Sequence, residues 1–592
     1  MTKAKSSHAN SYRQQTAKYT YLLGVIFLAV IILRLFYLQV IRHDYYDFLA
    51  DGIRSRIIPS IAPRGIIYDR NGIVLAESKL IYSLDILPYQ ISDQQFVLNF
   101  LKRIKIDTSA LEQRLNNKSY LPYELISVKR VLEPWQISYI EENKSALEGV
   151  VISTRIVRYY PQAKEAAHVL GYVGQIGSTE LSRLKNYGYQ MGDIIGLAGI
   201  ERYYDSYLRG VDGGQSLEVD KYGNPVRNLH SLESVPGHNI YLTIDFALQQ
   251  AASRVLGDRK GAIVIVNPQS GEVLAMVSKP DYDPNYFTDF LSEKEWQELR
   301  ANEHPLYNRA LGSYPPGSTF KIVTFMAALE DKIDTARQFF CNGHIVVTNR
   351  RFDCWYADHG GHGKQNLLQG FVNSCNIVFY NLGLLLTPQK IADTAAAFGL
   401  GVATNIDLPF ENNGFVPTER WKKRRYNQEW FPGDSLNMAI GQGYLLTTPL
   451  QMTLLTAAVA DEQNRLHKPY ILNKVLSVEG KAIVQNKPES VNTLPFTKAN
   501  IELVRGLMRD VVDGGTGSNA RVQGLVIRGK TGTAENQRKD HAWFVSYGPY
   551  EKPDLAMAVF VEEGGFGGTV AARIARDIYT WYDARAKQKG AG

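Results

Sequence analysis

The alternation of apolar and polar residues divides the chain into three stretches. The first contains an almost unbroken apolar run at residues 19–41, YTYLLGVIFLAVIILRLFYLQVI, in which Arg34 is the one charged side chain. A helix of this length would measure about 34 Å, which is enough to cross a lipid bilayer. We therefore predict a membrane-spanning helix at 19–41, preceded by a short tail at 1–18.

The charges before this run predict how the helix is oriented. Lys3, Lys5, Arg13 and Lys18 all precede it, and positive residues beside a membrane span usually stay in the cytoplasm. We expect a cytoplasmic N-terminus, with everything after residue 41 outside the cytoplasm. No small-residue cleavage site follows the run, which favours an uncleaved anchor. Arg34 would extend to the membrane surface or contact a partner within the membrane.

The second stretch, residues 42–235, has short apolar runs separated by turn residues. PRGIIYDRNGIVLA at 63–76 places Asn71 and Gly72 between two such runs, and an Asn-Gly pair in this position is typical of a tight β-hairpin. We predict a β-rich, elongated module that ends where SLESVPGHN at 231–239 interrupts the pattern.

The third stretch, residues 236–585, mixes strand and helix periodicities. Residues 239–256 change from strand-like alternation to helical spacing, and residues 261–278 have the pattern of two strands around a Pro-x-x-Gly turn. LVIRGKTGTAE at 525–535 indicates a further strand. We predict a mixed α/β domain of the α+β class, followed by a tail at 586–592.

Composition agrees with several globular domains. The 592 residues are too many for one ordinary hydrophobic core. Hydrophobic residues make up 45% of the chain and charged residues 21%, and the net charge of +7 is small for this length. Since no long basic run is present, we do not expect nucleic-acid binding.

A candidate reactive pair lies in the third stretch. SYPPGSTFKIV at 313–323 places Lys321 one helical turn after Ser318. A lysine amine whose pKa is lowered by burial could take the proton of the serine hydroxyl. Alternatively, Ser318 is only the cap of the helix predicted by FKIVTFMAALE at 320–330.

Two later motifs favour the chemical interpretation. NSCNIVF contains Ser374 and Asn376, and IRGKTGTAENQ contains the segment 530–533. The order S-x-x-K, S-x-N, K-T-G is the motif set of penicillin-binding proteins and serine β-lactamases. The chain therefore resembles this group of proteins.

The resemblance covers nearly the whole exported chain and is closest to the class B penicillin-binding proteins. Segments similar to that family's non-catalytic pedestal are 63–76, 158–162, 167–174 and 196–210, and segments similar to its transpeptidase domain are 314–321, 430–452 and 530–549. RLFYLQVIRHDYY at 34–46 and KDHAWFVSYGP at 539–549 resemble the elongation-type members more than the division-specific ones. No separate glycosyltransferase domain precedes the pedestal, so a bifunctional class A enzyme is not expected.

Residue types at these positions suit the roles that the resemblance implies. Ser318 would be the nucleophile and Lys321 its base. Ser374 would relay a proton to the leaving amine, and Asn376 would hold a substrate amide or the lysine. Lys530 would attract a substrate carboxylate and keep the amine of Lys321 neutral by like-charge repulsion.

The strand that carries Lys530 would also bind substrate. Thr531, Gly532 and Thr533 follow it, and Gly532 would allow the substrate backbone to approach closely. The backbone amides of Thr533 and Ser318 would form the oxyanion hole.

The resemblance implies a peptidoglycan D,D-transpeptidase of the bacterial plasma membrane, with its catalytic domain on the periplasmic or extracytoplasmic side. Its expected partners are peptidoglycan stem peptides, β-lactam antibiotics, the lipid bilayer and the membrane glycosyltransferase of the elongation complex. Two alternatives use the same residues differently. One is a carboxypeptidase or other acyl hydrolase, and the other is a mainly non-enzymatic activator of the glycosyltransferase.

The three cysteines fall between the first and last motifs. Three histidines lie among them in the sequence, and these are His344, His359 and His362; the cysteines are Cys341, Cys354 and Cys375. In an oxidising compartment, a disulfide between Cys341 and Cys354 would be usual. Three cysteines and one histidine also suit a closed tetrahedral zinc site, and three free buried thiols are the remaining possibility.

The zinc interpretation also agrees with the resemblance. Some elongation-type members have a structural zinc site at this position, and the matching histidine is His362, although His359 lies only three residues away. We expect zinc held by Cys341, Cys354, His362 and Cys375. Because Cys375 lies between Ser374 and Asn376, its side chain would point away from the cleft.

Overall fold

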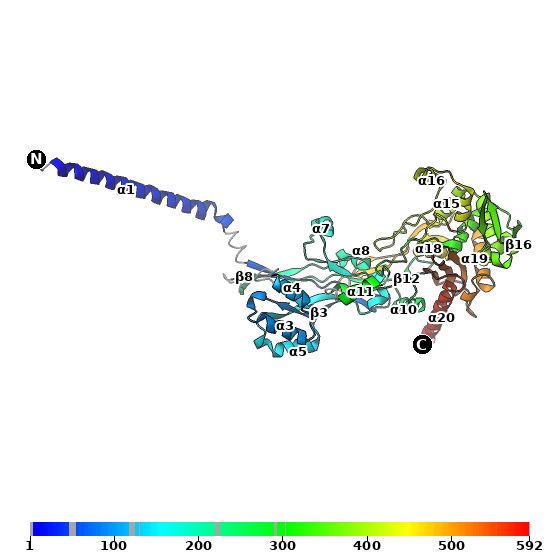
Figure 1. The fold of residues 1–592 in the computed structure, drawn as a ribbon, viewed down its shortest axis with the longest axis horizontal. Coiled ribbons are helices and arrows are strands. Elements are labelled where there is room, and N and C mark those ends of the chain that lie inside the picture. The colour runs from blue at the N-terminus through cyan, green and yellow to red at the C-terminus, as the bar shows by residue number, and fades with distance from the viewer. Residues whose placement is uncertain are drawn as a thin grey trace. The chain divides into compact units, whose positions relative to one another are not determined.

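The computed structural model describes residues 4–46, 55–117, 125–129, 131–219, 225–288, 293–301 and 303–590. The chain forms two compact units, which Figure 1 shows as a ribbon. Residues 1–62 and 211–235 make the first unit, and residues 63–210 and 236–592 make the second.

The first unit contains the predicted apolar helix. Helix α1 (Ala4–Phe36) continues into a π-helical turn, η1 (Tyr37–Ile41). Among the described residues, Ala17–Ile41 is the one helical segment long and apolar enough to cross a membrane, and none of it is buried. A three-stranded antiparallel sheet also belongs to this unit, in the order β1 (Ser55–Ser60), β8 (Gly213–Val219) and β9 (Pro225–Leu232).

The predicted hairpin opens the second unit. Strand β2 (Ile67–Tyr68) pairs antiparallel with β3 (Val74–Ile86), and Gly72 in the turn has a φ of +87°, which glycine adopts without strain. The long strand β3 also pairs with β4 (Ile126–Lys129) and β5 (Val150–Tyr159). A separate ribbon is formed by β6 (Val173–Gln175) and β7 (Ile194–Gly196). The strand-rich character of this stretch is confirmed.

Several short helices accompany these strands. Helix α3 presents Val97, Leu101 and the following Ile104 to a core that also contains Leu84 of β3, because residues three and four apart share one helical face. The helices of this stretch are α3 (Gln94–Arg103), α4 (Ser109–Asn116), α5 (Pro134–Glu142), α6 (Ala167–Leu170), α7 (Ser178–Leu184), α8 (Gly199–Tyr203) and α9 (Asp205–Leu208).

The third stretch, residues 236–585, is built on a five-stranded antiparallel sheet. Its order is β12 (Val273–Lys279), β11 (Gly261–Val266), β23 (Leu555–Val561), β22 (His541–Gly548) and β21 (Arg528–Ala534). The predicted strands at 261–278 and 525–535 are therefore present, and the first two form a hairpin.

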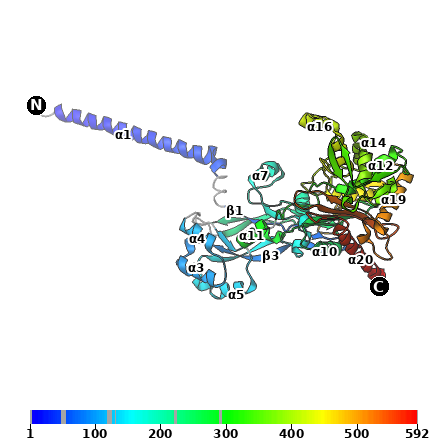
Figure 2. The ribbon, with the colours of Figure 1, turned by 45° about the vertical axis from the view of Figure 1, so that its right-hand side comes forward.

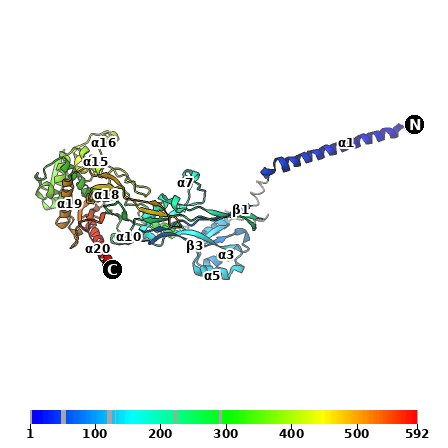
Figure 3. The same ribbon diagram turned by 180° about the vertical axis from the view of Figure 1, so that it is seen from behind.

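Both faces of this sheet are covered. Ile263 and Ile265 of β11 face a core with α10 (Phe246–Leu256) and α20 (Ala571–Gly590), while Val264 faces the other core, with α12 (Lys321–Glu330) and α18 (Pro449–Ala460). Alternate residues of a strand point to opposite faces, so a fully apolar strand is required between two layers of helices. Figures 2 and 3 show this helix-covered part from two further sides.

The remaining elements surround the sheet. The helices are α11 (Glu293–Ala301), α13 (Leu367–Val372), α14 (Asn376–Leu385), α15 (Pro388–Ala397), α16 (Glu419–Tyr426), α17 (Pro432–Ala439) and α19 (Lys498–Asp513). The short strands are β10 (Asn239–Leu242), β13 (Phe339–Cys341), β14 (His344–Val347), β15 (Arg350–Asp353), β16 (Gly363–Gln365), β17 (Arg465–His467), β18 (Leu472–Leu476), β19 (Ala482–Gln485) and β20 (Ser490–Thr493). Strand β10 pairs with both β2 and β18, so one sheet joins the two stretches of this unit.

Candidate active site

Ser318 lies in a 3₁₀ turn, η7 (Gly317–Phe320), that leads directly into α12. The cap positions of η7 and α12 are Pro316 and Phe320, and neither helix has a side-chain cap. The alternative that Ser318 is only a helix cap is therefore wrong. Its side chain is partly exposed, as a nucleophile must be to meet its substrate.

Lys321 lies one turn further along and is fully buried. Its Nζ donates hydrogen bonds of 2.7 Å to the carbonyl oxygen of Ser374 and 2.7 Å to Oδ1 of Asn376, and it lies 3.3 Å from Oγ of Ser374. Burial lowers the pKa of Lys321 to about 8. The two oxygen acceptors use both hydrogens of a neutral amine, which leaves its lone pair available to accept a proton.

Lys530 on β21 also contacts Ser374. Its Nζ donates a 2.9 Å hydrogen bond to Oγ of Ser374. Burial and the nearby charge of Lys321 hold the pKa of Lys530 well below its ordinary value. Oγ of Ser374 thus lies within hydrogen-bond distance of two lysine amines, so it can pass a proton between them.

The segment that carries Ser374 and Asn376 is held in an unusual conformation. Ser374 has a φ of +52°, which costs free energy for a residue with a side chain and persists only where its surroundings impose it. The indole Nε1 of Trp355 donates to the carbonyl oxygen of Ser374 at 3.2 Å, and Nδ2 of Asn376 donates to the carbonyl oxygen of Asp353 at 3.1 Å. The sequence analysis did not identify Trp355 or Asp353 as supports of this segment, because the only feature that marks them in the sequence is their position next to Cys354.

Strand β21 packs closely against the turn that carries Ser318. A Cβ atom on Gly532 would lie 2.8 Å from Cγ2 of Thr319 and 3.0 Å from the carbonyl oxygen of Pro316. A Cβ atom on Gly317 would lie 2.6 Å from the carbonyl oxygen of Thr533. Two glycines therefore allow the third motif to lie directly beside the nucleophile.

The side chains that follow Lys530 have further partners. Oγ1 of Thr531 is 2.7 Å from Oγ1 of Thr516, a residue that no sequence motif identified. Oγ1 of Thr533 accepts a 3.2 Å hydrogen bond from the backbone amide of Gly567. These contacts fix the side chains of the strand where it borders the site.

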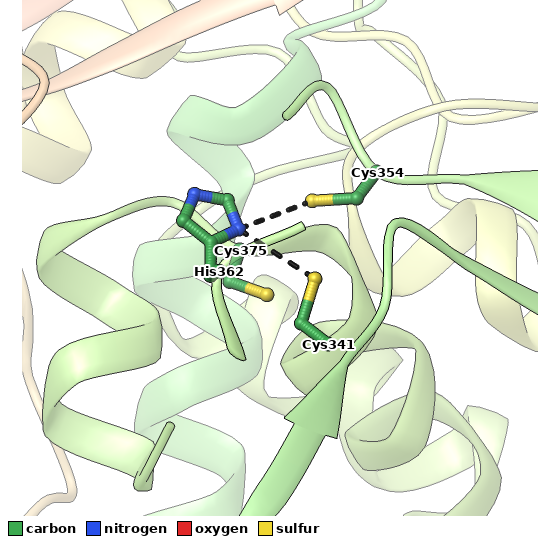
Figure 4. Close-up of side chains that lie close together, drawn as sticks. All are labelled: Cys341, Cys354, His362 and Cys375. Carbon is green, nitrogen blue, oxygen red and sulfur yellow. Dashed lines mark hydrogen bonds between the residues drawn. The ribbon is translucent and has the colours of Figure 1, made fainter. Parts of the chain in front are cut away.

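The three cysteines lie close to one histidine, as Figure 4 shows. One possible ligand atom from each of four residues lies within 4.8 Å of the others, and the four residues are Cys341, Cys354, His362 and Cys375. Nδ1 of His362 is 3.6 Å from Sγ of Cys341 and 3.5 Å from Sγ of Cys354. The hydrogen bond from the Cys375 thiol lowers the pKa of Cys354, and the same contact raises the pKa of Cys375.

This cluster fits the donor set of a structural zinc site. Tetrahedral zinc with Zn–S bonds of about 2.3 Å and Zn–N bonds of about 2.0–2.1 Å places sulfur and nitrogen about 3.5–3.6 Å apart, which agrees with both distances from His362. All three cysteines are unpaired, so the alternative of a disulfide between Cys341 and Cys354 is wrong for this structure. His359 is exposed and lies outside the cluster.

Comparisons with known proteins agree with the motifs. The family description "Penicillin binding protein transpeptidase domain" matches residues 261–580, and "Penicillin-binding Protein dimerisation domain" matches residues 59–242. The peptidoglycan D,D-transpeptidase MrdA of Acinetobacter baumannii is 33% identical over 588 residues, which cover 95% of this chain and 86% of the relative.

Solved structures are similar along most of the chain. Penicillin-binding protein 2 of Helicobacter pylori, in its complex with MreC, gives a TM-score of 0.74 at 28% identity and covers 89% of this chain and 99% of that one. A chain of a peptidoglycan synthase complex that coordinates polymerization and crosslinking gives 0.71 at 29% identity, covering 96% and 98%. The chain therefore belongs to the class B penicillin-binding proteins, where it is most similar to the D,D-transpeptidase penicillin-binding protein 2.

Proposed function

We propose that this chain cross-links peptidoglycan through an acyl-enzyme on Ser318. The observation that supports this most directly is the buried, hydrogen-bonded amine of Lys321, one turn after a partly exposed serine. Oγ of Ser318 would bond to the carbonyl carbon of the penultimate D-Ala of a stem pentapeptide while its proton passes to Nζ of Lys321.

The next steps complete the transfer. The bond from that carbonyl carbon to the terminal D-Ala nitrogen breaks, and the leaving amine receives a proton through Oγ of Ser374, which lies beside both lysine amines. An amine of a neighbouring stem then attacks the ester carbonyl and gives a proton to Nζ of Lys321, so that a new peptide bond forms. The bond from the carbonyl carbon to Oγ of Ser318 breaks, and Oγ takes up a proton to become the free hydroxyl again.

The strand β21 would hold the substrate during these steps. Lys530 would bind the terminal carboxylate, whose negative charge would favour the protonated amine, and Asn376 would hold the amine of Lys321 through Oδ1. The backbone amides of Ser318 and Thr533 would stabilise the oxyanion. The close contact between Gly317 and Thr533 supports this pairing of the two segments.

We propose zinc as a structural cofactor on Cys341, Cys354, His362 and Cys375. Their donor set and spacing support the assignment. Such an ion would contribute no chemistry to acyl transfer. It would fix the backbone of Cys375, and thereby its neighbours Ser374 and Asn376, from behind.

Turnover of a polymerised glycan tests the reaction. The purified full-length protein, supplied with lipid-linked precursor and a glycan polymerase, should release D-Ala and produce cross-linked stem dimers, and penicillin should block both. Release of D-Ala with tetrapeptides but no dimers would instead identify a carboxypeptidase. Unchanged polymer, together with faster polymerisation, would favour the non-enzymatic activator.

We also propose a single-pass topology with the N-terminus in the cytoplasm, supported by the apolar helix at Ala17–Ile41 and the basic residues before it.

The similarity to a chain of a peptidoglycan synthase complex supports a membrane glycosyltransferase partner, of the shape, elongation, division and sporulation family. We expect the membrane-spanning helix and the pedestal, residues 42–235, to bind this partner. A full-length chain should retain such a partner in detergent, whereas a chain without residues 1–235 should lose it. Equal retention by both would contradict this prediction.

A further inference from the structure

Helix α16 carries an unusual concentration of positive charge. Its sequence, ERWKKRRY, has five basic side chains and one acidic side chain. It lies at the outer edge of the third stretch, residues 236–585, in every view (Figures 1, 2 and 3). Two of its charges are neutralised by residues outside the helix, because Lys422 pairs with Asp434 and Lys423 pairs with Glu429.

The three arginines of α16 have no such partners. Arg420, Arg424 and Arg425 are exposed, and no ion pair or side-chain hydrogen bond in the described part of the chain includes them. The helix dipole favours positive charge in the last turn, but Arg420 lies in the first turn, where it does not. Arg420 and Arg424 are also four residues apart, so their charges repel across one face. Helix stability therefore does not explain Arg420, whereas an anionic partner beside the helix would.

Aromatic rings lie beside this charge. Trp421 of α16 contacts Tyr444 with ring centroids 5.1 Å apart, and Tyr426 stacks on Tyr444 at 5.7 Å. Tyr426 is 47% exposed and Tyr444 is 36% exposed. Exposed tyrosines next to arginines are typical of binding surfaces. A tyrosine ring offers an apolar face together with a polar hydroxyl, which suits the faces and edges of a sugar.

Tyr444 of this surface belongs to a segment that contacts the turn carrying Ser318. The amide of Gly317 donates a 2.9 Å hydrogen bond to the carbonyl oxygen of Gly441, and a Cβ atom on Gly441 would lie 2.1 Å from the carbonyl oxygen of Gly317. The segment at Gly441 therefore touches the backbone immediately before Ser318. Tyr444 follows three residues later, so its Cα lies within about 11 Å of that contact.

We propose that the α16 surface, composed of Arg420, Arg424, Arg425, Tyr426 and Tyr444, binds an uncross-linked peptidoglycan strand beside the cleft. The guanidinium groups would pair with free carboxylates of the stem peptides, for which the planar fork of arginine is well suited. The tyrosine rings would pack on the sugars. This inference rests on the proposed function, because it assumes that peptidoglycan is the substrate. The α16 surface would give the substrate strand a second contact outside the reacting stem.

Binding of a defined strand tests the inference without turnover. Fluorescently labelled, soluble oligomers of disaccharide-pentapeptide are titrated into full-length Ser318→Ala protein, and the dissociation constant is measured by anisotropy. The triple change Arg420→Glu, Arg424→Glu and Arg425→Glu should weaken binding about tenfold or more, because three pairs are lost and repulsion is added. Added salt should weaken binding to the parent protein.

A matched variant controls for net charge. Lys481, Lys487 and Lys498 are exposed lysines in the same domain, and changing all three to Glu alters the charge by the same amount. This control should stay within about twofold of the parent, since its positions lie outside the proposed surface. Equal weakening by both triple variants would overturn the inference.

A change in the strand avoids any folding defect in the protein. Oligomers whose stem carboxylates are amidated should bind the parent protein no more tightly than native oligomers bind the arginine variant. Tight binding of the amidated strand would overturn the proposed carboxylate contacts. A loss of binding to phosphatidylglycerol vesicles, with strand binding unchanged, would assign the surface to a membrane and overturn the inference. Cross-linking by the wild-type protein, measured separately, decides the proposed function, so the two failures are distinguishable.

Discussion

Replacing Lys321 with alanine should slow the acylation of Ser318 by penicillin about 10²–10⁴-fold, the usual contribution of a general base. The reason is that Nζ of Lys321 is buried and donates both hydrogens of its neutral form to Ser374 and Asn376. The rate is measured as the time course of labelling with a fluorescent penicillin.

Two variants separate the amine from its packing. Lys321→Met retains an apolar side chain of similar length, so it should be as slow as Lys321→Ala if the amine is responsible. Ser318→Ala should take up no label at all. Peptide mapping that placed the label on another serine would contradict the assignment of the nucleophile.

The pH profile gives a second measurement on the same group. The neutral amine is the active form and the pKa of Lys321 is about 8, so acylation should rise about tenfold per pH unit below pH 8 and level off above it. The Lys321→Met variant should lose this rise. A wild-type rate that stays constant between pH 6 and pH 9 would argue against Lys321 as the base.

Short sequence patterns predicted those elements of the fold that depend on residues close together in the chain. The Asn71–Gly72 turn, the hairpin at 261–278 and the strand at 525–535 all depend on residues close together in the sequence, and all are present. The helices between 94 and 142 did not stand out, because they are short and are separated by turns. Their apolar spacing, with Val97 and Leu101 on one face, becomes decisive only when β3 supplies the surface that covers it.

The residue types of the active site could be predicted from the sequence, but the residues that hold them in position could not. Three motifs identified the residues around the two lysines, since each motif is short and contiguous. The left-handed backbone of Ser374 and the indole of Trp355 that donates to it could not be predicted, because they depend on how distant segments meet. Thr516 reaches Thr531 in the same way. Sequence therefore specified the reacting groups, and tertiary structure specified their positions.

Removing one zinc ligand should have the second large effect. The full-length protein should contain about one zinc per chain, and its thiols should resist alkylation until a chelator is added. Cys375→Ser should remove the metal and lower the melting temperature by roughly 5–10 °C, because loss of a structural metal is among the most destabilising single changes. It should also slow labelling of Ser318, although it removes no reacting group, since residue 375 connects Ser374 to Asn376 and their contacts position Lys321.

The two neighbouring histidines provide the control for this prediction. His362 lies within the cluster, whereas His359 is exposed and lies outside it. His362→Ala should therefore lower zinc content, melting temperature and labelling together, and His359→Ala should change none of them. Equal effects of both changes would mean that the loop, rather than a metal, is responsible. Metal-free, fully active protein in which Cys341 and Cys354 are two hydrogens lighter and joined as a disulfide would exclude the zinc site.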